Sequence, residues 1–232
     1  MDKMLYRILF MALTCLLFAC LQQAAYSQEE QEEAAIKQSV IDFAKKALEG
    51  YVNNALNEEN VSRFGFKNLD EARTATLGIP RRVMVIGLRD LKQYKPGTAA
   101  KRLLSDVKAY WFPVMVGRET RTKLEIIEKE DKLVAGEFGK VNIVREVVSA
   151  EAQMPELLKS REIEEPLAPS ILKIPALQAM FLYIEYKDQE FLVPAMAQPQ
   201  RFKLGKAKLY TVDKVLSELS KVAQEIDEKK IR

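Results

Sequence analysis

Hydrophobic positions recur at helical spacing near both ends of the chain. Between residues 36 and 56, apolar side chains follow one another at steps of three and four, which places them on one face of a helix. The same spacing runs from Val212 to about Lys229. The pattern predicts a long N-terminal helix beginning near Gln28 and a C-terminal amphipathic helix.

Between these helices, the pattern changes to that of β-strands. Continuous apolar runs are typical of buried strands, and alternation of apolar with charged residues is typical of half-exposed ones. The predicted strands are residues 83–88, 110–116, 120–126, 133–138, 177–186, 191–195 and 202–210. Short polar turns follow two of these strands and predict antiparallel hairpins. We therefore expect an α+β fold, with one or more antiparallel sheets on which the two helices pack.

A proline-rich stretch divides the chain. Four prolines punctuate residues 153–175, which are rich in Glu and Lys and predict a linker. This linker separates an N-terminal α+β lobe at residues 28–152 from a C-terminal lobe of hairpin and helix at residues 176–232. Both lobes contain an apolar strand, a hairpin and a helix, so a relation between the two lobes is left open.

The first 27 residues have the layout of a bacterial signal peptide. Lys3 and Arg7 precede an apolar run from Ile8 to Leu21, and Ala25-Tyr26-Ser27 offers small residues for cleavage. The apolar run is shorter than the roughly 20 residues that span a bilayer. We expect an exported protein that is periplasmic or secreted.

A second possible cleavage site in this leader predicts a different location for the protein. Leu17-Phe18-Ala19-Cys20 resembles a lipobox, in which a leader of residues 1–19 is removed and Cys20 is lipidated. The protein would then be anchored in the cell envelope by lipid, and this is the one reading that implies a membrane contact. Both endings remain open.

Composition restricts the chemistry of the exported part. The chain of 232 residues has 36 Lys and Arg against 33 Asp and Glu, which gives no bulk attraction to nucleic acid. It has no histidine, and its only cysteines, Cys15 and Cys20, lie in the leader. Nucleophile pairs with histidine and histidine-ligated metals are therefore excluded. We expect a protein that is not an enzyme and that needs no metal or cofactor.

One segment carries a local excess of positive charge. Basic residues outnumber acidic ones between residues 81 and 108, and aromatic residues lie within or beside this segment. Such a surface would recognise an envelope protein or an anionic envelope component. The candidate binding residues are Arg81, Arg82, Arg89, Lys101, Arg102 and Trp111. The alternative is that these side chains have no binding role and only form the solvent-exposed faces of elements whose other faces are buried.

Two other functions compete with binding. Ser105 and Lys108 form a Ser-x-x-Lys spacing on a helix predicted for residues 98–107, which would place the amine beside the hydroxyl as in a serine hydrolase. A carboxylate pair is the other route to a hydrolase. A structural or assembly subunit that packs through the long N-terminal helix is the third class.

Overall fold

The computed structural model describes residues 38–105, 107–163, 169–196, 202–205 and 208–226. Internal contacts divide the chain into residues 1–41 and 42–232, and the structure describes only residues 38–41 of the first unit. The second unit contains the sheet and the helices that pack on it. The predicted signal peptide, the helix start near Gln28 and the alternative lipidation at Cys20 lie outside the described residues.

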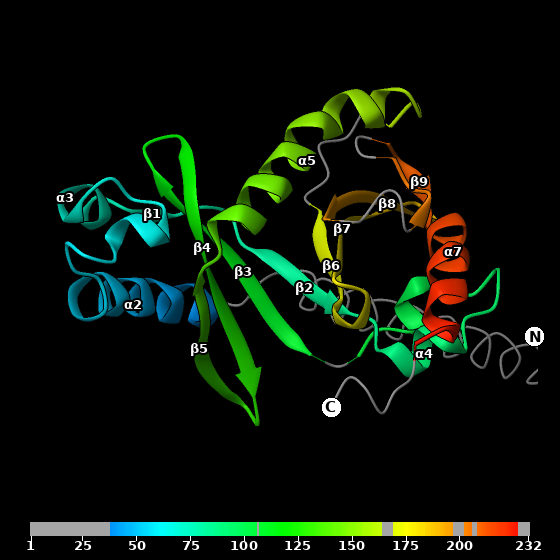
Figure 1. Cartoon of the computed structure of the whole chain (residues 1–232), viewed down its shortest axis with the longest axis horizontal. Coiled ribbons are helices and arrows are strands. Elements are labelled where there is room, and N and C mark those ends of the chain that lie inside the picture. The colour runs from blue at the N-terminus through cyan, green and yellow to red at the C-terminus, as the bar shows by residue number, and fades with distance from the viewer. Residues whose placement is uncertain (1–37, 106, 164–168, 197–201, 206–207, 227–232) are drawn as a thin grey trace, which may run out of the picture. The chain divides into compact units, whose positions relative to one another are not determined.

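The described chain contains helices, 3₁₀ turns and strands (Figure 1). The helices are α2 (Gln38–Asn54), α3 (Leu69–Arg73), α4 (Leu88–Lys92), α5 (Val141–Lys159) and α7 (Val212–Gln224). Single 3₁₀ turns are η1 (Val61–Phe64), η2 (Ala100–Arg102) and η3 (Pro175–Leu177). The strands are β1 (Thr76–Leu77), β2 (Arg81–Val85), β3 (Lys108–Val116), β4 (Glu119–Lys129), β5 (Lys132–Gly139), β6 (Ser170–Ile174), β7 (Ala179–Tyr186), β8 (Gln189–Met196) and β9 (Tyr210–Thr211).

The nine strands of the described residues belong to one sheet. Its order is β5-β4-β3-β2-β6-β7-β8-β9, and β1 pairs with β3 outside this path. Every pair is antiparallel except β2 with β6, which places Val83 beside Ile171 in parallel register. The predicted α+β class with an antiparallel sheet is confirmed, as are the hairpins β4–β5 and β7–β8.

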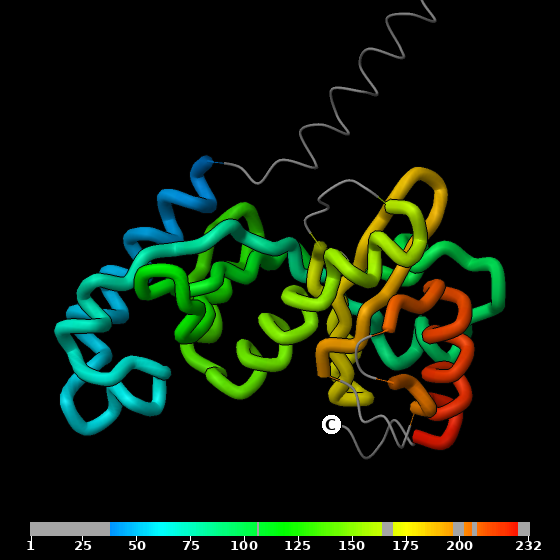
Figure 2. Tube along the Cα trace, turned by 90° about the horizontal axis from the view of Figure 1, so that it is seen from above, coloured from blue at the N-terminus to red at the C-terminus, as the bar shows by residue number. Residues whose placement is uncertain are grey.

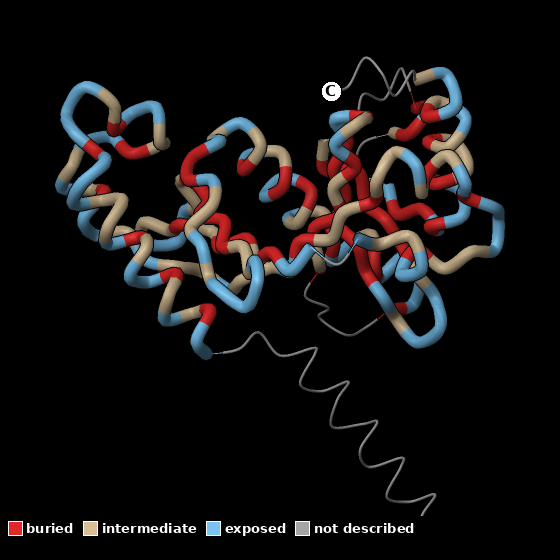
Figure 3. The backbone as a smooth tube through the Cα atoms, turned by 90° about the horizontal axis from the view of Figure 1, so that it is seen from below, coloured by how far each residue is buried: buried red, intermediate tan, exposed pale blue. Residues whose placement is uncertain are grey.

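Strands β6 to β8 are buried on both faces (red in Figure 3). Leu172 and Phe181 lie in a core shared with α7, whereas Ile171 and Leu182 lie in a core shared with α5. Because successive side chains of a strand point to opposite faces, this alternation means that helices cover both sides. It explains why β7 is a continuous apolar run rather than an alternating one.

The C-terminal helix forms as its periodicity predicts. Its buried stripe consists of Val212, Val215, Leu216, Leu219 and Ala223. Helix α4 lies against α7, although more than half of the described chain separates them in sequence (Figures 1 and 2). The two helices close one of the two cores.

The stretch predicted as a linker contains regular structure. Helix α5 continues through Pro155 to Lys159, and Ser170–Ile174 forms β6 in the middle of the sheet. A proline inside a helix costs about 3 kcal/mol. Burial of Leu158 and Ile163 beyond it, at about 1.5–3 kcal/mol per side chain, offsets that cost. The division into two lobes around this stretch stays a prediction.

Two predicted elements are wrong. In place of a helix over residues 98–107, the described residues form the turn η2 (Ala100–Arg102). The chain leaves the helical path there because Leu104 forms a β-bridge with Ile86 and the Ser105 N–H donates to the Val85 carbonyl. In place of a strand over residues 202–210, the structure has the two-residue strand β9, and Phe202 is buried in the α7 core.

Candidate functional site

The basic residues predicted from the sequence do not share one face of the sheet. Arg81 and Arg82 are neighbours on β2, so their side chains point to opposite faces. The Arg81 Nε donates to the Glu151 carboxylate of α5 at 3.0 Å, and only 16% of the arginine side chain is exposed. Arg81 therefore holds α5 on the sheet, while Arg82 is exposed.

The other predicted positions also separate. Arg89 lies on α4, and Lys101 and Arg102 lie on η2, with Lys101 and Arg102 exposed and the Arg89 side chain 80% exposed. Trp111 is 2% exposed and belongs to the core beneath α5. The expectation that Trp111 contributes to a binding surface is wrong, because its strand neighbours and α5 bury the ring.

The geometric premise of a Ser105–Lys108 hydrolase is also wrong. No helix brings the two residues together: Ser105 lies outside the regular elements and Lys108 begins β3. The Ser105 hydroxyl donates to the Val85 carbonyl at 3.1 Å, and the Lys108 ammonium pairs with Glu128 at 3.5 Å. Ser105 and Lys108 therefore interact with different residues and not with each other.

A basic concave surface lies elsewhere, between η1 and the start of α5. Its volume is about 700 Å³. Its lining residues are Ser62, Arg63, Gly65, Phe66, Lys67, Lys140, Val141, Asn142, Ile143 and Arg145. We call it the basic hollow, because four of these residues are cationic and none is acidic. Arg63, Lys67, Lys140 and Arg145 are all exposed.

Two glycines bring its walls together. Gly65 has φ +90°, and a Cβ there would lie 2.5 Å from the Arg121 carbonyl oxygen, so the chain passes β4 more closely than any other residue permits. Gly139 has φ +111° and lies against the Phe64 ring. These close approaches hold η1 beside the junction of β5 and α5.

Helix α5 begins at the hollow without the usual capping. Its N-cap residue, Lys140, is in the left-handed region at φ 64°, makes no side-chain cap and is followed by no acidic residue in the first turn. Backbone N–H groups at a helix start carry partial positive charge. They add to the positive charge of the four lining side chains.

Glu71 fixes the opposite wall. Its carboxylate accepts the backbone N–H of Lys67 and pairs with the Arg121 guanidinium at 2.7 Å. The backbone hydrogen bond from Lys67 and the ion pair with Arg121 hold the pKa of Glu71 below its ordinary value. The Lys67 backbone is thus anchored to β4.

The four cations differ in how far they are neutralised. Lys140 pairs with Glu137 at 3.3 Å, and both side chains are about half exposed. Arg63 and Arg145 form no ion pair with any other described residue. The hollow therefore keeps a positive charge that an anion can use.

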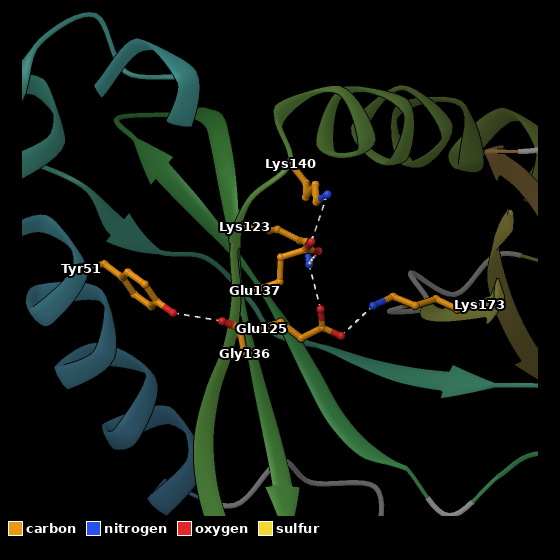
Figure 4. Close-up of polar contacts among 7 residues, drawn as sticks. All are labelled: Tyr51, Lys123, Glu125, Gly136, Glu137, Lys140 and Lys173. Carbon is orange, nitrogen blue, oxygen red and sulfur yellow. Dashed lines mark hydrogen bonds and ion pairs between the residues drawn. The ribbon is translucent and has the colours of Figure 1, made fainter. Parts of the chain in front are cut away.

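A chain of ion pairs leads from the hollow into the sheet (Figure 4). Beyond Lys140, Glu137 pairs with the Lys123 ammonium at 2.7 Å. Lys123 also donates to Glu125 at 2.8 Å, and Glu125 pairs with Lys173 of β6 at 2.6 Å. Only 2% of the Lys123 side chain is exposed. These ion pairs link strands β4, β5 and β6 through their side chains.

The surroundings of Lys123 keep both of its carboxylate partners ionised. Burial alone would raise the pKa of Glu125, but the ammonium groups of Lys123 and Lys173 hold it below its ordinary value. Glu137 behaves in the same way: burial opposes the shift, and Lys123 and Lys140 lower its pKa. The Lys123 ammonium also lies 5.4 Å from the centre of the Trp111 ring, within cation–π range.

Two other kinds of site can be checked among the described residues. They contain no cluster of three or more Cys, Asp or Glu residues placed to hold a metal ion. Nor is any helix among them both long enough and apolar enough to cross a bilayer. What the basic hollow can do chemically is bind negative charge.

Sequence reasoning missed this hollow. Its walls come from residues 62–67 and 140–145, and nothing in the chain links these segments until β4 and β5 fold between them. One signal was present: Phe64-Gly65-Phe66 is flanked by Arg63 and Lys67, which combines aromatic and basic residues. Comparison with protein-family models, curated proteins and solved structures finds no match to this chain.

Proposed function

We propose that this chain is an exported, non-enzymatic protein of the bacterial cell envelope that binds an anionic partner or ligand through the basic hollow. Export rests on the predicted leader. The absence of histidine and of cysteine beyond the leader favours binding over catalysis.

The observation that carries the proposal is the charge of the hollow. Arg63, Lys67, Lys140 and Arg145 converge on one concave surface, and no acidic residue lines it. The predicted surface at residues 81–108 lacks this convergence, because Arg81 is ion-paired to α5 and Trp111 is buried. The concentration of positive charge expected there is found instead at the basic hollow, whose aromatic residue Phe66 is buried like Trp111.

We propose phosphate groups of envelope lipids as the anions that this site binds. They are a source of fixed negative charge in the proposed compartment, and a basic patch gains about 1 kcal/mol per Lys or Arg near such a surface. Exposed charges are screened by salt, so binding should weaken as the salt concentration rises from about 0.05 to about 0.3 M.

Sedimentation with vesicles tests this function. The mature chain is mixed with vesicles of phosphatidylglycerol or of phosphatidylcholine, and pyrophosphate serves as a soluble competitor. Replacing Arg63, Lys67 and Arg145 by Ser is expected to lower the affinity for phosphatidylglycerol about a hundredfold, at about 1 kcal/mol per cation.

A variant with the same loss of charge is the matched control. It carries Ser at Arg82, Arg89 and Arg102, all from the surface predicted from the sequence and all with solvent-accessible side chains. Its affinity should change by less than about threefold. Equal losses in both variants would show bulk electrostatics rather than a site, and a loss in the control alone would assign binding to the predicted surface.

A further inference from the structure

A second concave surface lies between α2 and the residues that lead from α3 into β1. Its volume is about 570 Å³, within the range of small-molecule sites. Its lining residues are Lys45, Leu48, Glu49, Val52, Asn53, Ala72, Arg73, Ala75, Thr76 and Leu77. We call it the α2–α3 pocket.

The floor of this pocket is apolar. Leu48 and Val52 are one turn apart on α2, and Ala72, Ala75 and Leu77 line it from α3, β1 and the residues between them. Leu48 and Ala72 are buried within the protein. Ala75 leaves the space open, because a larger side chain at this half-buried position would fill it. Val52, Ala75 and Leu77 are half-buried, so an aliphatic chain would replace water against these three residues.

Polar groups at the rim determine which end of a ligand would face solvent. Lys45 pairs with Asp42 at 3.7 Å and Arg73 pairs with Asp70 at 2.9 Å, and all four side chains are more than half exposed. Exposed pairs of this kind are worth about 0–1 kcal/mol, so a ligand carboxylate can replace either aspartate.

The balance of these rim groups favours an anion. Lys45, Arg73 and the Asn53 amide are hydrogen-bond donors, whereas Glu49 is the single carboxylate of the lining. A ligand with a cationic head would meet two cations and one carboxylate. A ligand with an anionic head meets the opposite balance once it has displaced Asp42 and Asp70, which pair with the two cations but do not line the pocket.

We infer that the α2–α3 pocket binds a small amphipathic anion: an unbranched aliphatic chain that lies on Val52, Ala75 and Leu77, with a carboxylate head at Lys45 and Arg73. This site is separate from the basic hollow, because the two linings share no residue. It recognises hydrocarbon as well as charge, and it does not depend on the proposed function of the hollow.

Calorimetric titration of the mature chain with linear alkanoates of about four to twelve carbons tests this inference, each below its micellar concentration. Each added methylene is expected to raise the affinity about fourfold until the pocket is filled, after which the affinity levels off. Alkyltrimethylammonium ions of equal chain length are expected to bind at least tenfold more weakly. Affinity that is independent of chain length, or equal for both head groups, would overturn the inference.

Two variants separate the contributions of the chain and the head. Ala75→Leu fills the pocket from a half-exposed position and should lower the decanoate affinity at least tenfold, with unchanged circular dichroism and thermal midpoint as the folding control. Arg73→Gln should lower the affinity of every alkanoate by a similar factor and leave the fourfold step per methylene intact.

A third variant links the result to this pocket. Arg89→Gln removes an exposed cation that lies outside the pocket and should change nothing. The Ser variant of Arg63, Lys67 and Arg145 should also bind decanoate normally. If Ala75→Leu binds decanoate as tightly as the unsubstituted chain, the ligand lies elsewhere and the inference is wrong.

Discussion

The Lys123 ammonium donates to the Glu125 carboxylate at 2.8 Å, two positions along β4, with only 2% of the lysine side chain exposed. Two-residue spacing places both side chains on the same face of the strand, and α5 packs against β4. Glu137 and Lys173 extend the pair, so each buried charge has an opposite charge beside it. Such a group is stable only while its partners are present.

Lys123→Met is therefore expected to destabilise the fold strongly. It leaves Glu125 and Glu137 with one cation each, and removal of one partner of a buried pair costs about 3–5 kcal/mol. Urea unfolding followed by circular dichroism measures the loss. Lys45→Met removes an exposed lysine and should change the free energy of unfolding by less than about 0.5 kcal/mol. A similar small change for Lys123→Met would show that the buried pairs add nothing.

Stability should fall in acid. The pKa values of Glu125 and Glu137 are lowered in the folded state, so their contribution is fully present above the unfolded value of about 4.3 and is lost as the pH falls through the folded values. Urea unfolding between about pH 3 and pH 7 should show a plateau above about pH 5 and a decline below it. The decline should be shallower in Glu125→Gln, and an equal slope in both proteins would remove Glu125 as a cause.

Gly65→Ala should destabilise the wall of the basic hollow. The new Cβ would lie 2.5 Å from the Arg121 carbonyl at a φ of +90°, so we expect a loss of more than about 1 kcal/mol. Gly97 is a matched control, since its φ is +86° and nothing lies within 4 Å of its Cβ position. The difference between the two alanine variants in thermal unfolding measures the clash alone, and equal losses would mean that backbone conformation accounts for both.

Glu190 should control the segment around η2. Its carboxylate accepts the N–H groups of Ala100 and Lys101 and the Tyr183 hydroxyl, the last at 2.7 Å. In Glu190→Ala these donors lose their acceptor, so trypsin should cleave after Lys101 and Arg102 several times faster. Mass spectrometry of the early fragments measures this. Glu185→Ala, which removes a carboxylate 3.5 Å from the same hydroxyl, should leave the cleavage rate unchanged.

Elements that are determined by their own local sequence pattern could be predicted. The apolar residues of α7 recur at helical spacing, which predicts the helix and its buried face. The hairpin β7–β8 is predicted by the short polar turn between two apolar runs. Lys123 and Glu125 were not predictable as buried residues, since charged residues alternating with Leu124 and Ile126 indicate a solvent-facing side. Their burial depends on tertiary packing, including α5, which follows later in the chain and packs against β4.

Tertiary packing also decided where α5 ends. Pro155 indicates a helix end on local grounds. Burial of Met154 and Leu158 against the sheet keeps the helix intact across it. The basic hollow is unpredictable for a related reason: Arg63 and Arg145 come together only through the path of β4 and β5 between them.

The parallel pairing of β2 with β6 has a consequence for the order in which the protein folds. Hairpins β4–β5 and β7–β8 are local, and such units form within microseconds. The β2–β6 pair needs the ends of a long loop to meet, which is slow and occurs only after β6 has been synthesised. Until then, the edge of β2 at Val83 is an unpaired apolar strand, open to pairing with another chain. The first half of the sheet is therefore open to misassembly at this edge until the second half pairs with it.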